Sequence, residues 1–424
     1  MKKRIISMLA CGLLAASSVV GLVACGKDAE TVELTLWGSA TQQETFKQMA
    51  EEFKKANPDV NYNIKVGIGE EDMAFSNVGK DPDAAADVYC YSNDQLVPLL
   101  RVGALARLGG SYLENVKSTN TEESVKSGST GWGTADEKVY GYPYASDNGY
   151  FMYYDKSVVT DEQAGSLEAI ISACEAANKQ IAWALDVPWY TAGWFFTFGG
   201  EYSVTYDDKH NEKSVDINFD GDVGIKASKA IAKLTESKSF AGEGTKDTTI
   251  TTGFATRKTA VAVSGTWNAK RIKESLGDDY GVCKLPTVTV DGETKQLYSF
   301  KGYKLFGVNP HSGDKIAHAH KLAAFLSSES LQKERFEKHL IGPTNKVLAE
   351  SDEVKNDAAI KALNAQNAFA VEQTSVPSKF WEPLKGYGLS IIQGLVDETG
   401  SGDKLTYAEQ LVKMVAQIKG SVKS

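Results

Sequence analysis

Cysteine and histidine are scarce, with five of each in a chain of 424 residues. Two cysteines lie within the first 25 residues, and the other three are far apart: Cys90, Cys174 and Cys283. No CxxC pair and no cysteine–histidine spacing typical of zinc occurs, so neither a disulfide framework nor a zinc site is predicted. His318 and His320 are two residues apart on an expected helix and would not share a face, so they predict no metal site either.

Basic residues are outnumbered, with 46 Lys and Arg against 55 Asp and Glu and a formal net charge of −9. The first 24 residues hold three basic groups and no acidic one, so the remainder carries −12. Binding to nucleic acid or to an anionic membrane surface requires an excess of Lys and Arg. The composition therefore excludes nucleic acid as a partner and argues against adsorption to an anionic membrane surface.

Motifs of several enzyme and metal-binding classes are missing. The chain has no P-loop and no GxSxG elbow. Its many carboxylates do not exclude the pair of catalytic carboxylates that a glycoside hydrolase uses. Residues 216–221 match the first half of a calcium loop, but position twelve is Ala227 where that loop needs Glu. We expect an acidic turn at a helix start there, and no metal or cofactor.

One long apolar run is present, and it lies at the N-terminus. Residues 1–4 are basic, residues 5–23 are uncharged, and Ala24, Cys25 and Gly26 complete a pattern that resembles a bacterial lipobox. The alternative is a transmembrane anchor. The small residues before Cys25 and the polar stretch after it favour cleavage. The sequence thus predicts a signal peptide over 1–24, a lipidated Cys25 and tether over 25–31, and a body on the extracellular face of the membrane.

Apolar residues alternate in some segments and recur at helical spacing in others. Strands are expected over 32–37, 60–68, 87–91, 139–144, 149–154, 180–185, 259–264, 279–284, 296–300 and 301–308. Helices are expected over 41–56, 93–100, 166–178, 188–198, 224–236 and 266–275, and from 315 onward. This order predicts βαβ units with mostly parallel sheets. Residues 145–148 are predicted to be a crossing between strands, and 118–130 a solvated loop.

Most of the tryptophans stand beside expected turns or helix starts. The seven are Trp37, Trp132, Trp183, Trp189, Trp194, Trp267 and Trp381. Trp189 and Tyr190 follow Pro188 at the start of a helix, and Trp267 comes directly after a strand. Ligands of open α/β sheets bind just past the carboxyl ends of strands, so these rings are placed to face a cleft.

A sugar explains this combination of residues. A flat aromatic ring covers the apolar C–H face of a pyranose, and carboxylates and amides pair with its hydroxyl groups. An unpaired buried hydroxyl would cost about 1–3 kcal/mol. For any single tryptophan, core packing is an equally good explanation, so the hypothesis depends on the collective pattern.

Several short segments match one family in order along the chain, from about residue 32 to 418. Besides the lipobox they are 34–37, 57–60, 87–89, 141–145, 151–156, 199–200, 260–267, 343–346 and 380–381. The chain resembles the sugar-binding lipoproteins of ABC importers, the extracellular solute-binding protein family 1. Within that family it is most similar to the maltose and maltodextrin binders.

The resemblance implies a periplasmic-binding-protein type II fold, in which two α/β lobes flank a ligand cleft and several chain crossings form a hinge. Crossings would fall near 145–149, 299–303 and 343–354. Lobe 1 would comprise 32–146 and 302–350. Lobe 2 would comprise 147–301 and 351–424.

The resemblance also implies which side chains bind the sugar. Tyr91 would stack on it, Asp94 would accept hydrogens from its hydroxyls, and Asp147 would hold the hinge carboxylate position. The other stacking positions match Trp189, Tyr190, Trp267 and Trp381. Further polar side chains expected at the site are Ser39, Thr41, Gln42, Gln95, Asp186 and Lys385.

The function implied is capture of an oligosaccharide, most simply a maltooligosaccharide, and its delivery to the transmembrane subunits of an ABC permease. Such a protein would be a monomer, would need no cofactor, would touch the membrane through its lipid alone and would not be an enzyme. Two other classes stay open: an extracellular carbohydrate-active enzyme, and a binding protein that serves a sensor system or takes a different oligosaccharide.

Overall fold

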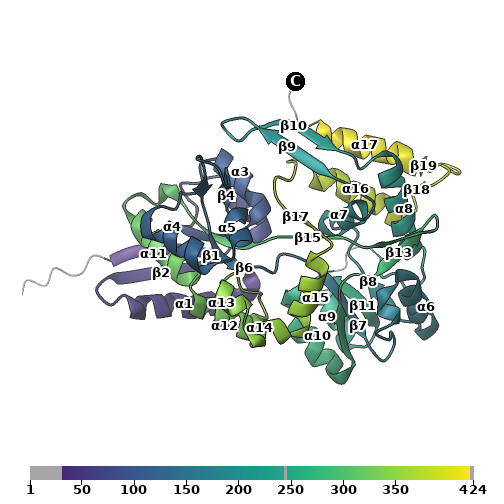
Figure 1. The fold of residues 1–424 in the computed structure, drawn as a ribbon, viewed down its shortest axis with the longest axis horizontal. Helices are drawn as coiled ribbons and strands as arrows, with labels where there is room; N and C mark the ends of the chain where they lie inside the picture. The colour runs from purple at the N-terminus through teal and green to yellow at the C-terminus, as the bar shows by residue number, and fades with distance from the viewer. Residues whose placement is uncertain (1–30, 243–245, 421–424) are drawn as a thin grey trace, which may run out of the picture.

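The computed structural model describes residues 31–242 and 246–420, which form two α/β lobes joined by several crossings (Figure 1). Lobe 1 is the part packed on the five-stranded sheet, and lobe 2 is the part packed on the four-stranded sheet. None of the helices in these described ranges is both long and apolar enough to cross a membrane.

The sheet of lobe 1 has the order β2-β1-β3-β16-β6. Its strands are β1 (Thr31–Gly38), β2 (Asn61–Ile68), β3 (Val88–Ser92), β6 (Tyr142–Ala145) and β16 (Lys304–Val308). Strands β1, β2 and β3 are parallel, whereas β16 is antiparallel to both β3 and β6. The chain therefore leaves lobe 1 after β6 and returns to it as β16.

Helices cover both faces of this sheet. They are α1 (Gln43–Ala56), α2 (Ala74–Val78), α3 (Leu96–Arg101), α4 (Gly110–Thr119), α5 (Glu122–Ser127), α11 (Ile316–Leu326) and α12 (Glu329–His339). Alternate residues of β3 belong to different clusters: Val88 and Cys90 pack with α1 and α11, and Tyr89 and Tyr91 pack with α2 and α3. Strand β3 is thus buried on both faces.

The sheet of lobe 2 has the order β12-β7-β11-β8. Its strands are β7 (Phe151–Asp155), β8 (Gln180–Ala182), β11 (Thr259–Ser264) and β12 (Tyr280–Cys283). Strand β11 is parallel to β8 and antiparallel to β7. Helices α9 (Asp247–Ala255), α10 (Ala269–Leu276) and α15 (Ala358–Asn367) pack on one face.

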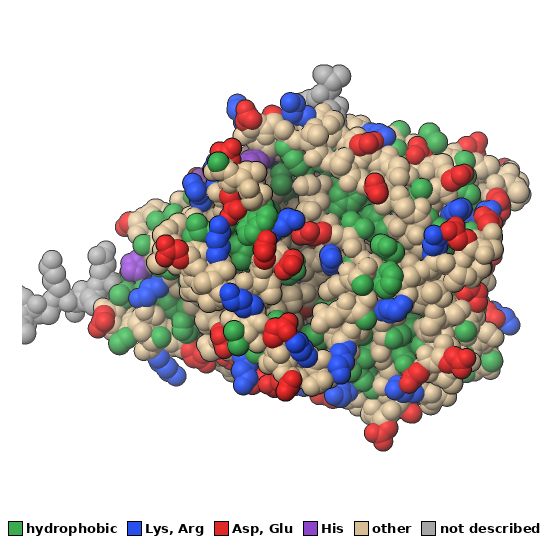
Figure 2. Space-filling model, viewed as in Figure 1, with side chains coloured by type: hydrophobic (Ala, Val, Ile, Leu, Met, Phe, Trp, Pro, Cys, Tyr) green, Lys and Arg blue, Asp and Glu red, His purple; other side chains and the backbone are tan. Residues whose placement is uncertain are grey.

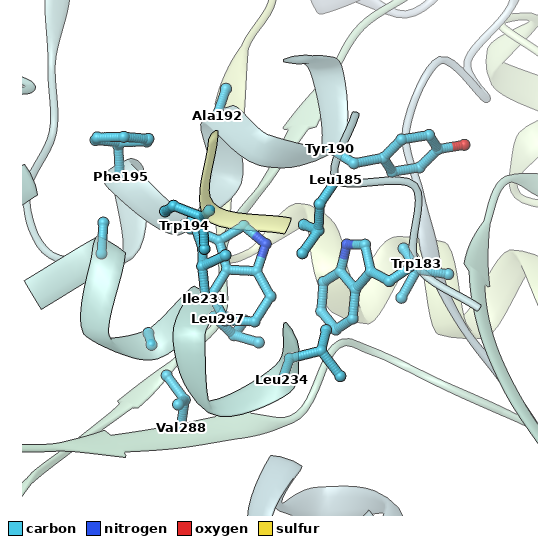
Figure 3. Close-up of a cluster of buried hydrophobic side chains, with 14 of the residues drawn as sticks. Trp183, Leu185, Tyr190, Ala192, Trp194, Phe195, Ile231, Leu234, Val288 and Leu297 are labelled. Carbon is cyan, nitrogen blue, oxygen red and sulfur yellow. The ribbon is translucent and has the colours of Figure 1, made fainter. Parts of the chain in front are cut away.

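The other face of this sheet carries the largest core. The helices there are α6 (Leu167–Ala177), α7 (Pro188–Thr197), α8 (Gly221–Thr235), α16 (Trp381–Ile392) and α17 (Tyr407–Lys419). Trp183 and Trp194 lie side by side in it, with ring centroids 4.9 Å apart, as Figure 3 shows. Both rings are at most 2% exposed, so these two tryptophans are core residues.

Three stretches of chain connect the lobes. The first joins β6 to β7, the second joins β15 (Ser299–Lys301) to β16, and the third runs from α12 to α15. Ser146 N donates to Gly342 O at 2.8 Å, so the first and third stretches touch. Strand β17 (Ala370–Glu372) pairs with β15. The lobe boundaries given from the resemblance stay a prediction.

The remaining elements are short. They are η1 (Ala40–Gln42), η2 (Glu71–Met73), η3 (Asn93–Gln95), β4 (Ser129–Thr130), β5 (Lys138–Val139), η4 (Gln163–Gly165), β9 (Tyr202–Tyr206), β10 (Glu212–Ile217), η5 (Thr266–Asn268), η6 (Gly277–Asp279), β13 (Thr287–Val290), β14 (Glu293–Gln296), η7 (Pro310–Lys315), α13 (Lys346–Ala349), α14 (Asp352–Asn356), β18 (Val396–Asp397) and β19 (Leu405–Thr406).

Most expected elements are confirmed, with three corrections. The expectation of mostly parallel sheets is wrong, because β16 is antiparallel to β3 and β6, and β7 is antiparallel to β11 and β12. Strands β7 and β16 each follow a crossing from the other lobe rather than a helix of the same lobe, so they are not part of βαβ units. The predicted strand over 296–300 is wrong, because β14 ends at Gln296 and β15 begins at Ser299. The predicted loop over 118–130 is wrong as well, since it contains α5 and β4. In α5 the hydroxyls of Ser124 and Ser127 donate to the backbone at 2.8 and 2.7 Å, which lets these polar residues lie buried beside Val125.

Candidate functional site

Turns at the carboxyl ends of the lobe 1 strands bring polar side chains together. Strand β1 leads into η1, where the hydroxyls of Ser39 and Thr41 are 3.1 Å apart. Gln42 is 5% exposed, and within the described residues its buried Oε1 has no hydrogen-bond donor. This edge of the sheet is where the sequence places a ligand.

Asp94 lies in the turn η3 after β3 and is 7% exposed. Its carboxylate accepts hydrogen bonds from Ser92 Oγ at 2.6 Å and from Gln95 Nε2 at 2.7 Å. Gln95 Oε1 in turn accepts from the backbone N–H of Phe75 at 3.2 Å, which ties this turn to α2. Burial raises the pKa of Asp94 to about 6, so its charge changes near neutral pH.

The pKa of Asp94 gives a stability prediction. The pKa of Asp94 is about 6 in the folded protein and 3.8 ordinarily, so the folded protein holds the proton more tightly than the unfolded chain does. Protonated Asp94 therefore favours the folded state below pH 4, and this contribution to stability is lost as the pH rises through 6. Between pH 4 and pH 7, the free energy of unfolding of Asp94→Asn should rise by about 1–3 kcal/mol relative to that of wild type. Urea unfolding at both pH values measures this, and equal pH dependence in the two proteins would contradict it.

The stacking role expected of Tyr91 is wrong in this structure. Its side chain is 0% exposed and packs among residues that include Leu99 and Leu305. A Cβ added at Gly141 would come within 2.3 Å of its hydroxyl oxygen, so the ring fills a tight space. The physical reason is that helices cover both faces of β3, which leaves none of its side chains facing a cleft.

Asp147 and Lys304 form an ion pair where the first and second crossings meet lobe 1. Asp147 is 0% exposed; its Oδ1 lies 3.2 Å from Lys304 Nζ, and its Oδ2 accepts from Thr266 Oγ1 at 2.8 Å. Burial lowers the pKa of Lys304, but the carboxylates of Asp147 and Glu71 outweigh this and the net pKa is raised. The pair therefore links the start of β16 in lobe 1 to η5 in lobe 2.

Sequence reasoning missed two members of this cluster, Lys304 and Glu71. Glu71 is 8% exposed and accepts from the Tyr144 hydroxyl at 2.7 Å. Burial raises its pKa above the usual value. One signal in the sequence could have identified Lys304. It is the first residue of a strand that is otherwise buried, and a buried lysine needs a carboxylate beside it.

Three aromatic side chains of lobe 2 meet beside this ion pair. Trp189 and Tyr190 begin α7, where Pro188 occupies the first turn. The Trp189 and Trp267 ring centroids are 6.2 Å apart, and Lys304 Nζ is 5.5 Å from the Trp267 centroid. Trp267 is partly exposed, whereas Tyr190 is 8% exposed and Figure 3 shows its hydroxyl directed away from the core cluster.

Trp267 is held in a fixed orientation. Its indole Nε1 donates to Asp247 Oδ2 at 3.0 Å, and its ring lies against Gly265, where an added Cβ would be 1.8 Å from Cζ3. Glycine is needed at 265 because any side chain would displace the ring. A partly exposed, immobilised indole is suited to cover one face of a flat ligand.

Trp381 and Lys385 stand apart from this group. Trp381 begins α16, is partly exposed, and contacts Phe300 and Phe380 with centroids 5.9 and 5.1 Å away. Within the described residues none of its ring contacts is with Trp189 or Trp267. Lys385 is exposed one turn later on α16, and Asp186 is partly exposed before α7. Their roles stay a prediction.

The surface is hollowed between the lobes on the face seen in Figure 2, with acidic and basic side chains around the hollow. A cavity of about 320 Å³ lies between residues of both lobes, including Asn93 and Leu96 on one side and Tyr206 and His210 on the other. None of the predicted stacking residues lines this cavity. Within the described part of the chain, no group of three or more His, Cys, Asp or Glu side chains could hold a metal ion.

Comparisons with known proteins agree with this geometry. Residues 48–362 match the family model described as bacterial extracellular solute-binding protein. The chain is 24% identical over 408 residues to a galactooligosaccharide-binding protein of Bacillus subtilis, which covers 91% of this chain and 92% of that one. It is 26% identical over 432 residues to a maltooligosaccharide ABC transporter solute-binding lipoprotein of Streptococcus pneumoniae, at coverages of 92% and 94%.

A solved structure described as being with acarbose is similar over the whole fold. It shares 30% identity and a TM-score of 0.79, and the match covers 93% of this chain and all of that one. The similarity extends across both lobes and the crossings between them.

Proposed function

The chain belongs to the bacterial extracellular solute-binding protein family, and on that premise we propose that it captures an oligosaccharide for an ABC importer. The fold class predicted from the sequence, a type II periplasmic-binding-protein fold, is confirmed by the similar solved structures. In this fold a ligand bound in the cleft contacts both lobes.

One observation carries the proposal: the Trp267 indole of lobe 2 lies over Lys304 of lobe 1, beside the buried carboxylate of Asp147. An aromatic face next to charged hydrogen-bonding groups matches a pyranose, which has an apolar face and a polar rim. Because both lobes contribute, a sugar here would hold them together. Ser39, Thr41, Gln42 and Gln95 are proposed to complete the polar rim.

We propose a maltooligosaccharide as the ligand. The relatives bind either maltooligosaccharides or galactooligosaccharides by their descriptions, and the structure at 30% identity was solved with acarbose. Calorimetric titration with maltose, maltotriose, maltotetraose, a β-galactotriose, cellobiose and xylobiose tests the choice. We expect a maltooligosaccharide to bind most tightly. If the galactotriose binds most tightly, the proposed ligand is wrong, but the proposed function in oligosaccharide capture still holds.

The protein is proposed to bind the sugar without cleaving it, since its family consists of solute-binding proteins. Chromatography of maltotetraose after long incubation should recover it intact. Shortened products would instead favour the carbohydrate-active enzyme.

Lobe closure is the first consequence. The ion pair Asp147–Lys304 and the crossings form a connected hinge, and a ligand that contacts both lobes favours the state in which they are close. Small-angle scattering should show a smaller radius of gyration with saturating maltotetraose. An unchanged radius, with binding proven by calorimetry in the same sample, would contradict closure.

Anchoring is the second consequence, although Cys25 lies outside the described residues. We propose that a diacylglycerol on Cys25 holds the protein, as a monomer, at the extracellular face of the membrane, where it meets the permease subunits. Cys25→Ala removes the thiol that would carry the diacylglycerol, and stable anchoring needs two or more acyl chains. The variant should therefore be released into the medium or remain as the uncut precursor. Equal membrane binding of wild type and Cys25→Ala would refute lipidation.

A further inference from the structure

The segment after β17 is fixed between the lobes by its backbone. Gln373 is 4% exposed, and its N–H donates at 2.8 Å to the carbonyl oxygen of Lys301, the last residue of β15, where the second crossing begins. Its carbonyl oxygen accepts from Asn93 Nδ2, in the turn before Asp94, at 2.8 Å. The residue is thus tied both to a crossing and to a turn of lobe 1.

The side chain of Gln373 reaches Trp189. Its Oε1 accepts from the Trp189 indole Nε1 at 2.7 Å and from Asn148 Nδ2, in the first crossing, at 3.2 Å. The Trp189 indole is partly buried, and an N–H that is shielded from water needs an acceptor, because leaving it unpaired costs about 1–3 kcal/mol. One amide oxygen therefore joins a predicted stacking ring to the first crossing.

Trp189 also packs against neighbouring aromatic rings, and its carbonyl oxygen accepts from the Tyr150 hydroxyl at 3.3 Å. Tyr150 and Tyr190 pack edge-on against it with centroids 4.7 and 5.1 Å away, and Trp267 lies 6.2 Å away at 37°. Ring packing limits the tilt of an indole, whereas a directional hydrogen bond decides which edge faces the crossing. The hydrogen bond to Gln373 thus selects the ring's orientation.

The second crossing is shaped to let the amides meet. A Cβ added at Gly302 would lie 2.4 Å from Asn93 Oδ1 and 2.9 Å from Asn148 Nδ2. Asn93 Oδ1 also accepts from the N–H of Tyr303 at 3.1 Å. A glycine at 302 keeps Asn93 and Asn148 close to Gln373, so the amide cluster is packed as a unit.

We propose that Gln373 is a positioning residue of the sugar cleft, which holds the Trp189 indole in one orientation relative to the first two crossings. This inference rests on the proposed function for its ligand, but its contacts belong to the protein itself. The hydrogen bond presets the ring before the sugar arrives, so less orientational freedom is lost on binding.

A double-mutant cycle tests the coupling. Gln373→Met keeps the length of the side chain and removes the amide oxygen, and Trp189→Phe keeps a ring and removes the N–H. With maltotetraose, Gln373→Met should weaken binding about tenfold, or about 1.4 kcal/mol. In the Trp189→Phe background the same change should weaken it less than twofold. A tenfold loss in both backgrounds would overturn the proposal.

Gln373→Glu provides the matched control for packing. It has the same length and loses the same amide N–H₂ as Gln373→Met, but it keeps an acceptor for Trp189. We expect it to bind maltotetraose at least threefold more tightly than Gln373→Met. A role in packing alone would weaken both variants equally, and that result would overturn the proposal.

The indole proton of Trp189 gives a readout that needs no sugar. Its ¹H–¹⁵N signal is identified by its loss in Trp189→Phe, and it should exchange slowly in wild type and faster in Gln373→Met. An unchanged signal would overturn the positioning role. If wild type binds none of the sugars, the proposed function fails, while this signal still decides whether Gln373 positions the ring.

Discussion

Trp267→Ala should weaken maltotetraose binding by about 30- to 1,000-fold. The indole is immobilised by Asp247 and Gly265, so a sugar face that stacks on it orders no flexible group. Removing such an aromatic anchor typically costs about 2–4 kcal/mol of binding free energy. Isothermal titration calorimetry measures the loss directly.

Trp132→Ala is the matched control for this prediction. Trp132 is also partly exposed, but it packs at the edge of the lobe 1 core and contacts Lys117. Its loss should leave the affinity within twofold of wild type. If folded Trp267→Ala keeps normal affinity while its melting temperature falls, Trp267 is a packing residue and does not belong to the sugar-binding site.

Trp381→Ala separates the same alternatives at a second position. Its contacts with Phe300 and Phe380 provide a packing role, and its exposed part leaves a stacking role open to test. Measuring affinity and melting temperature on the same sample assigns it to one or both.

Lys304→Met should strongly destabilise the folded protein. It removes the cation that contacts Asp147 and leaves the buried carboxylates of Asp147 and Glu71 uncompensated. Breaking a buried ion pair in this way costs about 3–5 kcal/mol. For lobes of this size we expect the melting temperature to fall by about 6–20 °C.

Lowering the pH should reduce this loss. Burial already raises the pKa of Glu71, so the folded protein takes up that proton more readily than the unfolded chain, and acid favours the folded state. Protonation of Glu71 should stabilise the folded state more when Lys304 is absent. The loss of unfolding free energy in Lys304→Met, relative to wild type, should therefore be smaller at pH 5 than at pH 7. A deficit that grows on acidification would contradict this account.

An exposed lysine supplies the control for Lys304. Lys47 pairs with Glu44 on α1 at 2.7 Å, with side chains 56% and 83% exposed. Lys47→Met should change the free energy of unfolding by at most about 1 kcal/mol. The double variant Asp147→Asn, Lys304→Met should be less destabilised than the two single losses added together, since both charges leave at once.

Local signals made much of this architecture predictable. Pro188 marks the start of α7, and the glycine at 265 separates strand β11 from the turn that carries Trp267. Both signals act within a few residues, so the sequence is sufficient to place Trp189 and Trp267 at element starts. The order of strands and helices likewise predicted an α/β fold, whereas the two lobes were implied by the family resemblance.

Side-chain direction and long-range pairing were not predictable in the same way. Tyr91 lies at the end of the short apolar strand predicted over 87–91. Such a strand can have one face covered or both, and the packing of α2 and α3 shows that both are covered. Lys304 meets Asp147 and Trp267 through two separate crossings. Gln373 likewise meets Trp189 only because β17 pairs with β15.

The most direct test is a crystal structure of the protein grown with maltotetraose. We expect one intact oligosaccharide between the lobes, with a pyranose face on Trp267, a hydroxyl near the Asp147–Lys304 pair, and the lobes closer together than in crystals grown without sugar. A sugar bound elsewhere on the surface, or a cleft that stays empty and open at saturating maltotetraose, would contradict the assignment of this cleft as the oligosaccharide site.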